Sequence, residues 1–198
     1  NDNFAENIFI GGQMGCRGDA YSGTIVMEVE QAYNFHSQQT ILFSKENVDF
    51  LFAGIMPEIN ESIGMAKAMA ETNLPYIISF MLTKDGCLMD GTLIADAIKT
   101  IDEQEFTEPL FYMTNCIHPT NLKHALNSDT NKNSEYLRRF KGIQANASCL
   151  SPEKLNNCEG LFKGNFDKIV NEMIILQKQF KFKVFGGCCG TNELFFKK

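Results

Sequence analysis

Three cysteines in this sequence lie at the ends of two apolar runs. Cys188 and Cys189 are adjacent in "KVFGGCCGTN", and Cys116 ends the run "PLFYMTNC". If both runs are parallel strands, the three thiols meet at one edge of a sheet, where the loops of α/β folds assemble their sites. Three thiolates around a zinc ion leave a fourth position open for exchange, which is the pattern of a catalytic zinc centre.

The other cysteines and the histidines lack this setting. We expect four cysteines to be small buried hydrophobes: Cys16, Cys87, Cys149 and Cys158. Burial explains the adjacent pair, taken alone, about as well as zinc does, because zinc ligands commonly follow C-x2-C spacing. His118 is expected to be a loop residue or a donor to a ligand, whereas His36 and His124 have no ligand spacing. The odd number of cysteines, seven, favours a reducing cytoplasm over a disulfide scaffold.

The elements that must position the thiols are predicted from alternating apolar runs and stretches of helical spacing. Strands are expected near residues 7–12, 49–54, 76–81, 110–115, 142–147 and 183–187. Helices are expected within 25–44, 57–73, 92–103, 119–127, 134–140, 166–180 and 192–198. Nearly continuous apolar runs indicate parallel strands buried on both faces, so the chain is predicted to be one α/β domain. Its six units fit either an open, doubly wound sheet or a barrel that lacks two of eight units.

Charge and hydropathy exclude several classes of function. The net charge is −6 and no basic run exceeds two residues, which argues against nucleic-acid binding. No apolar run approaches the roughly 20 residues of a membrane span, and the first residues do not resemble a signal peptide. In "GGQMGCRGD" the glycines at 12, 15 and 18 follow G-x-x-G-x-x-G spacing, unlike a dinucleotide fingerprint, so no nicotinamide cofactor is expected.

Several motifs together resemble one known family. "FGGCCGT" and "NCIHP" resemble the paired zinc signatures of the homocysteine S-methyltransferases, whose fold is a (βα)8 TIM barrel. "GQMGCRGDAY", "MLTKDGCLMDGT" and "QANAS" resemble segments after the third strand, after the fifth strand and in the seventh strand. The resemblance implies strands 3 to 8 of the barrel, in a single domain over residues 1–198 that is incomplete at its N-terminus.

The resemblance also implies a function and a site. It implies zinc-dependent transfer of a methyl group to the thiol of homocysteine, giving methionine. The donor would be a small molecule such as S-methylmethionine or S-adenosylmethionine. The zinc ligands would be Cys116, Cys188 and Cys189, and the implied substrate-binding positions are Gly187, Asn115, Asn146 and Gly54.

The sequence departs from the family where the substrate ammonium would bind. Family members carry Glu-Thr where "FAGIMPE" has Gly54 and Ile55, and nothing here matches their first strand, of Asp-Gly-Gly type. A charge-assisted hydrogen bond of the lost kind contributes about 1.5–3 kcal/mol. Two further hypotheses therefore stand: a truncated or degenerate zinc-binding barrel without turnover, and methyl transfer to a different thiol. Assembly into homo-oligomers is left open.

Overall fold

The computed structural model describes residues 8–21, 26–150 and 164–197. Six strands form one sheet in the order β1 to β6, and every neighbouring pair is parallel. The strands are β1 (Gly11–Gly15), β2 (Phe50–Met56), β3 (Tyr76–Phe80), β4 (Phe111–Ile117), β5 (Phe140–Ala145) and β6 (Val184–Gly187). A doubly wound sheet reverses its strand order at a switch point. The strictly sequential order therefore confirms the barrel-type prediction.

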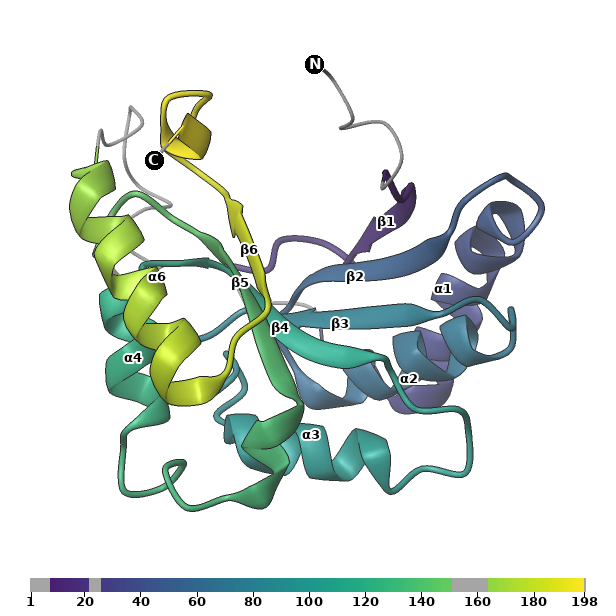
Figure 1. Ribbon diagram of the computed structural model, residues 1–198. Helices are drawn as coiled ribbons and strands as arrows, with labels where there is room; N and C mark the ends of the chain where they lie inside the picture. Colours follow the sequence, from purple (N-terminus) through teal and green to yellow (C-terminus); the bar gives the residue numbers. More distant parts are fainter. Residues whose placement is uncertain (1–7, 22–25, 151–163, 198) are drawn as a thin grey trace.

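Helices follow the strands and lie around the outside of the curled sheet (Figure 1). The α-helices are α1 (Val29–Phe43), α2 (Ile59–Ala70), α3 (Ile94–Asp102), α4 (Pro119–Leu126) and α6 (Phe166–Phe180). Short 3-10 helices, η2 (Glu135–Arg139) and η3 (Phe195–Lys197), take the place of two predicted α-helices. Within the described residues, no helix has the length and hydrophobicity that crossing a membrane requires.

Five of the six predicted strands are confirmed with ends within two residues, and the first is misplaced. Residue 7 lies outside the described residues, and β1 begins only at Gly11. The side chains of Ile8, Phe9 and Ile10 are exposed. Ile10 hydrogen-bonds Asp49, the residue before β2, through its backbone N–H and oxygen. The parallel ladder with β2 starts at Gly11 opposite Phe50. Hydrophobicity alone therefore predicted the strand too early.

The core lies between the sheet and its helices. Leu51 of β2, Ile78 of β3 and Tyr112 of β4 are fully buried there. On the helix side they meet α2 and α3, whose Met69 and Ile98 are also fully buried. Because the strands alternate their side chains between two faces, the same strands send a second set of apolar residues to the opposite, concave face.

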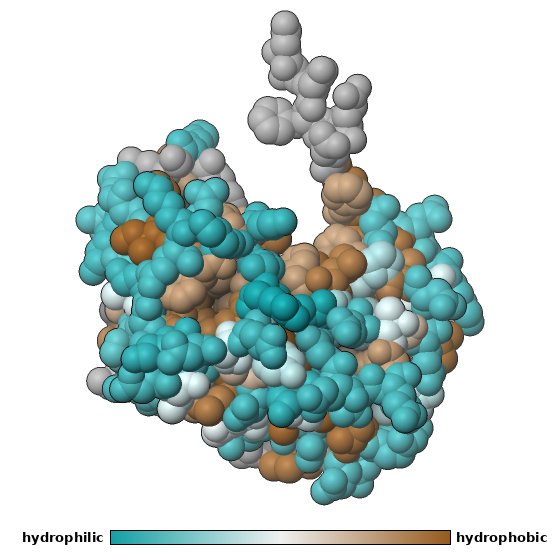
Figure 2. All heavy atoms as spheres, turned by 60° about the horizontal axis from the view of Figure 1, so that its bottom comes forward, coloured by the Kyte–Doolittle hydropathy of each residue, from teal (hydrophilic) through white to brown (hydrophobic). Residues whose placement is uncertain are grey.

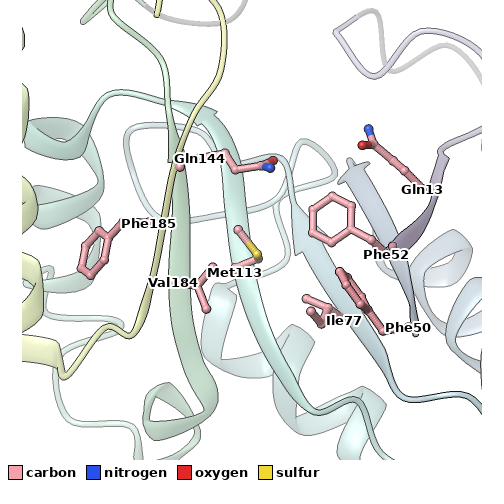
Figure 3. A pocket seen from close by; sticks show the side chains of 10 residues that line it. Gln13, Phe50, Phe52, Ile77, Met113, Gln144, Val184 and Phe185 are labelled. Atoms are coloured by element: carbon pink, nitrogen blue, oxygen red, sulfur yellow. The ribbon is translucent and has the colours of Figure 1, made fainter. Parts of the chain in front are cut away.

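The concave face of the sheet holds an open pocket of about 310 Å³. Its floor is apolar and includes Phe52, Ile77 and Met113, while Gln13 of β1 and Gln144 of β5 extend toward it from opposite sides (Figure 3). Among the described strands, β1 and β6 each have one neighbour, so the sheet is open between its first and last strands, as predicted. The space-filling view is mostly hydrophilic, with hydrophobic atoms in the notch between its left and right parts (Figure 2).

The close packing of α1 against α2 depends on a helical glycine. A Cβ at Gly64 would lie 2.5 Å from both the Ala32 Cβ and the Val29 backbone oxygen. We expect Gly64→Ala to lower the free energy of unfolding by about 1–2 kcal/mol, because overpacking costs about 1–3 kcal/mol and the gain in helix propensity offsets up to about 1. Urea unfolding of this variant tests the packing. Gly15→Ala is the control, since that Cβ meets nothing within 4 Å. Unchanged stability of Gly64→Ala would contradict the packing.

Candidate metal centre

The structure brings the three predicted cysteines together at the carboxyl-terminal edge of the sheet. Cys116 lies in β4, and Cys188 and Cys189 directly follow β6. Their sulfur atoms all lie within 4.8 Å of one another, and those of Cys188 and Cys189 are 3.9 Å apart. Elsewhere in the described residues no other three side chains of metal-binding type cluster this closely. The cluster is half-buried, with Cys189 exposed.

A bulge in β4 aims the Cys116 side chain. Asn115 pairs with Gln144 and Ile117 pairs with Ala145, so Cys116 is the extra residue on its strand. Its backbone is left-handed, with φ of 60°. A bulge of this kind re-aims a side chain, and a non-glycine residue in this conformation is strained. This strained conformation accompanies a Cys116 thiol that lies close to the cysteine pair at the end of β6.

Residues 145–147, which are the last residue of β5 and the two after it, connect the two strand ends that carry the cysteines. The Cys188 N–H donates to the Ala145 oxygen at 2.8 Å, and the Ala147 N–H donates to the Cys189 oxygen at 2.9 Å. On the other side, the Asn146 N–H donates to the Ile117 oxygen at 3.0 Å. These backbone hydrogen bonds hold the end of β4 and the cysteine pair in one fixed arrangement.

The glycines around the cysteine pair have steric reasons. A Cβ at Gly187 would clash with the Thr191 side chain, whose hydroxyl donates to the Cys188 oxygen at 2.6 Å. Gly190 has φ of 79°, a left-handed value that favours glycine. The turn after β6 is therefore tight, and the hydroxyl of Thr191 holds it. The structure thus gives Gly187 a packing role. Its predicted contact with substrate stays a prediction.

The three thiols share their protons unequally. The hydrogen bond from Cys116 lowers the pKa of Cys188 to about 6. The same hydrogen bond raises the pKa of Cys116, and burial raises the pKa of Cys189. The cluster thus carries one thiolate readily and resists further ionisation. A bound cation would change this, because coordination deprotonates a thiol.

Asn115, a predicted substrate contact, is buried and joins neighbouring strand ends through hydrogen bonds. Its Oδ1 accepts from the Ser79 hydroxyl at 2.6 Å and from the Ile55 N–H at 3.0 Å. Ile55 is left-handed, with φ of 51°, at an irregularity in the pairing of β2 with β3. Asn115 therefore ties together the ends of β2, β3 and β4 beside Cys116. Gly54, the other predicted position on β2, directly precedes Ile55.

Asn146 and His118 make hydrogen bonds within their own loops. Asn146 is buried, and its Oδ1 accepts from the Ser148 N–H at 2.9 Å. His118 caps α4 by accepting from the Thr120 N–H at its Nδ1, and burial lowers the pKa of His118. Among the described residues, neither side chain forms a hydrogen bond with the three thiols. Substrate binding by Asn146 stays a prediction.

The remaining cysteines follow the sequence expectation in part. Cys16 and Cys87 are half-buried, and burial raises the pKa of both, that of Cys16 to about 11. Cys149 is exposed, so its predicted burial is wrong; the loop after β5 leaves it at the surface. Cys158 lies outside the described residues. No disulfide joins the six cysteines that the structure describes.

Tyr21 is a titratable residue that the sequence did not single out. It lies in the loop after β1, where burial raises its pKa and the charge of Cys116 raises it further. The charges of Cys188 and Cys189 act in the same direction. Tyr21 ends the segment "GQMGCRGDAY", and the sequence gives no sign of this electrostatic influence from the thiols.

The comparisons with known proteins identify the family of this fold and site. The family model described as homocysteine S-methyltransferase matches residues 1–194, so the chain belongs to the homocysteine S-methyltransferase family. No curated protein matches the sequence.

Solved structures of one bacterial enzyme share the fold. The homocysteine methyltransferase MmuM from Escherichia coli matches in its apo form with a TM-score of 0.66 and 18% identity, over 95% of this chain and 61% of that one. The metallated form gives 0.69 and 19%, over 97% and 60%, and the oxidized form gives 0.65 and 19%, over 90% and 53%. The present chain thus spans less than two thirds of these relatives, and its six parallel strands form a curled half-barrel.

The lowered pKa of Cys188 predicts its reactivity in the metal-free protein. Because the thiolate is the nucleophile, a lowered pKa moves the onset of alkylation to lower pH. We expect the iodoacetamide rate at Cys188 to reach half its maximum near pH 6. Cys87, whose pKa burial raises, should react only at more alkaline pH. Tandem mass spectrometry of the modified peptides separates Cys188 from Cys189, and a Cys188 profile like that of a free thiol would contradict the prediction.

Proposed function

We propose that this chain carries the metal centre of a zinc-dependent S-methyltransferase that methylates the thiol of homocysteine and yields methionine. The observation that carries the proposal is the cluster of Cys116, Cys188 and Cys189, whose sulfurs lie within 4.8 Å of one another at two parallel strand ends. Membership of the homocysteine S-methyltransferase family supports the reaction class.

The donor set fits zinc. Tetrahedral zinc with bonds of about 2.3 Å to sulfur would place its sulfurs about 3.8 Å apart. The sulfurs of Cys188 and Cys189 are 3.9 Å apart, and the whole cluster requires only a small contraction. Soft thiolates suit zinc, and the exposed side of the cluster, at Cys189, leaves access for a fourth ligand.

Zinc bound to these residues would keep the acceptor thiol ionised at neutral pH, where a free thiol is mostly protonated. The acceptor sulfur then attacks the methyl carbon of the donor. With a sulfonium donor the methyl–sulfur bond breaks, and the electron pair leaves with a neutral thioether. S-methylmethionine and S-adenosylmethionine are the donors that we propose, because both carry such a sulfonium.

The chain's own contribution is to hold three ligands on a rigid rim. The backbone hydrogen bonds of Ala145, Asn146 and Ala147 fix the two strand ends, and Asn115 supports the bulge beside Cys116. The pocket on the apolar concave face extends to Gly186, two residues before Cys188. Pre-organised ligands lower the entropy that is lost when the metal and the acceptor bind.

The acceptor's ammonium group has no carboxylate at Gly54. We therefore propose that its counter-charge comes from outside the strands described here, and that the backbone around Gly187 is the local acceptor of its hydrogen bonds. The absence of a carboxylate at Gly54 also favours two alternatives. One is a degenerate zinc-binding barrel without turnover, and the other is methyl transfer to a thiol that lacks an amino group.

We also propose a reducing compartment such as the cytoplasm, because the three thiols must remain free to bind a metal.

Removing one cysteine tests the metal centre. We expect Cys116→Ala to lose the zinc that the unmodified protein holds at about one ion per chain, and with it all methyl transfer, because two thiolates cannot replace a three-thiolate site. Metal analysis by plasma mass spectrometry and a homocysteine methylation assay are the measurements. Cys87→Ala is the matched control and should retain both. Full zinc content in Cys116→Ala would refute the centre.

Restoring a carboxylate tests the acceptor. A Cβ at Gly54 would lie 3.2 Å from the Phe52 ring and 3.7 Å from the Gln13 Nε2, so a side chain fits after a small ring movement. We expect Gly54→Glu to tighten homocysteine binding by about tenfold or more, as one charge-assisted hydrogen bond allows, with unchanged zinc content. Calorimetry on the zinc-loaded protein measures this.

Gly54→Gln is the control for shape without charge and should not tighten binding. If Gly54→Glu leaves the affinity for homocysteine flat, or if an amine-free thiol is methylated equally well, homocysteine is not the acceptor. The zinc centre is tested separately by the cysteine variants.

A further inference from the structure

Among the described residues, four that are not glycine have a left-handed backbone, and two of them lie at the carboxyl-terminal edge of the sheet. Asn73 and Lys181 lie near the ends of α2 and α6, where this conformation is common. Ile55 and Cys116 differ, because they lie within β2 and β4, with φ of 51° and 60°. A β-branched residue such as Ile55 is a rare exception in this region. Strain of this kind persists only where the surrounding structure enforces it.

Both strained residues are joined to Asn115. Its Oδ1 accepts from the Ile55 N–H at 3.0 Å, and Asn115 directly precedes Cys116 in β4. The same oxygen accepts from the Ser79 hydroxyl at 2.6 Å, so β3, which lies between β2 and β4, is tied to them as well. Because a backbone N–H can only donate, the side chain must turn its oxygen toward β2. One amide oxygen therefore joins three strand ends.

Burial makes these two hydrogen bonds hard to replace. Asn115 is 7% exposed and Ser79 is 0% exposed. Without the Asn115 oxygen, the Ile55 N–H and the Ser79 hydroxyl would lose their acceptor where water has little access, and an unpaired buried donor is destabilising. The left-handed conformation of Ile55 would also lose a hydrogen bond that holds it. The ends of β2 and β4 would then relax toward regular strand geometry.

Such a relaxation of β4 would move a proposed zinc ligand. Cys116 is the extra residue between Asn115 and Ile117, which both pair with β5. A bulge re-aims the side chain that it carries. On a regular strand, successive side chains alternate between the two faces, so loss of the bulge would change the direction of the Cys116 thiol. In the structure this sulfur lies within 4.8 Å of those of the cysteine pair after β6.

We propose that Asn115 is a positioning residue of the metal centre that acts through Cys116. By accepting hydrogen bonds from Ile55 and Ser79, it holds the bulge that keeps the Cys116 sulfur beside the cysteine pair. The inference rests on the proposed function and assigns Asn115 to the metal. A residue that only contacted substrate would change the affinity for homocysteine and leave metal binding as it is.

The test is Asn115→Ala, with the zinc dissociation constant measured against a competing chelator. We expect this constant to rise by about tenfold or more, because the left-handed conformation of Cys116 carries strain of that order once nothing holds it. In the cobalt-substituted protein, the sulfur-to-cobalt absorption band reports the sulfur ligands, and we expect it to weaken as one sulfur is lost. A loss of stability alone would not change the number of sulfur ligands.

Asn131→Ala is the matched control. Asn131 is also a fully buried asparagine, and its Nδ2 donates to the Gly86 oxygen at 3.1 Å and to the Ala125 oxygen at 3.2 Å. Both partners lie outside the six strands. We therefore expect Asn131→Ala to lower the stability of the protein but to leave the zinc dissociation constant and the cobalt band unchanged. Circular dichroism of the metal-free variants checks that they fold.

Ser79→Ala decides the question if Asn115→Ala does not fold. It removes one of the two donors, so we expect the zinc dissociation constant to rise by about two- to tenfold. If the folded variants at Asn115 and Ser79 match Asn131→Ala in zinc affinity and in the cobalt band, Asn115 only stabilises the sheet and the inference is wrong, while the proposed zinc centre stands. If the unmodified protein binds neither zinc nor cobalt, the proposed function fails together with the role of Asn115.

Discussion

The backbone hydrogen bonds of residues 145–147 are the constraint on which the candidate site depends. They join the end of β4 on one side to the cysteine pair after β6 on the other, through Ile117, Cys188 and Cys189. Parallel strands that are next-but-one neighbours in a sheet would otherwise end about 9–10 Å apart. The curl of the sheet, the bulge at Cys116 and the tight turn after Gly187 reduce this separation until the sulfurs lie within 4.8 Å of one another.

Hydrogen bonds hold the carboxyl-terminal edge of the sheet in place, and the concave face below it is open. At the rim, Asn115 satisfies two donors from neighbouring strands and stabilises the left-handed Ile55. Below it, side chains such as Phe52 and Met113 line a pocket that a closed barrel would fill with layers of side chains. The three proposed zinc ligands therefore all lie within the described residues, while the concave face below them is open between β1 and β6.

The sequence predicted the order of strands and the identity of the clustered thiols, because both depend on local patterns. Apolar runs mark buried parallel strands, and residues at their ends converge in any fold of this type. Contacts between distant loops carry no local pattern. The hydrogen bond of His36 in α1 with Glu61 in α2, 2.9 Å between Nε2 and Oε1, follows from tertiary packing. The apolar residues Ile8, Phe9 and Ile10 were predicted to form a strand, but they are exposed and the pairing with β2 begins only at Gly11.

The central claim is that three cysteine sulfurs hold one zinc ion and leave a position for the acceptor sulfur. X-ray absorption at the zinc edge tests it most directly, because it counts the ligand types around the metal. The account predicts three sulfurs at about 2.3 Å and one lighter atom in the substrate-free protein, with a fourth sulfur after homocysteine is added. Four sulfurs before homocysteine is added, or a shell of nitrogen and oxygen alone, would contradict it.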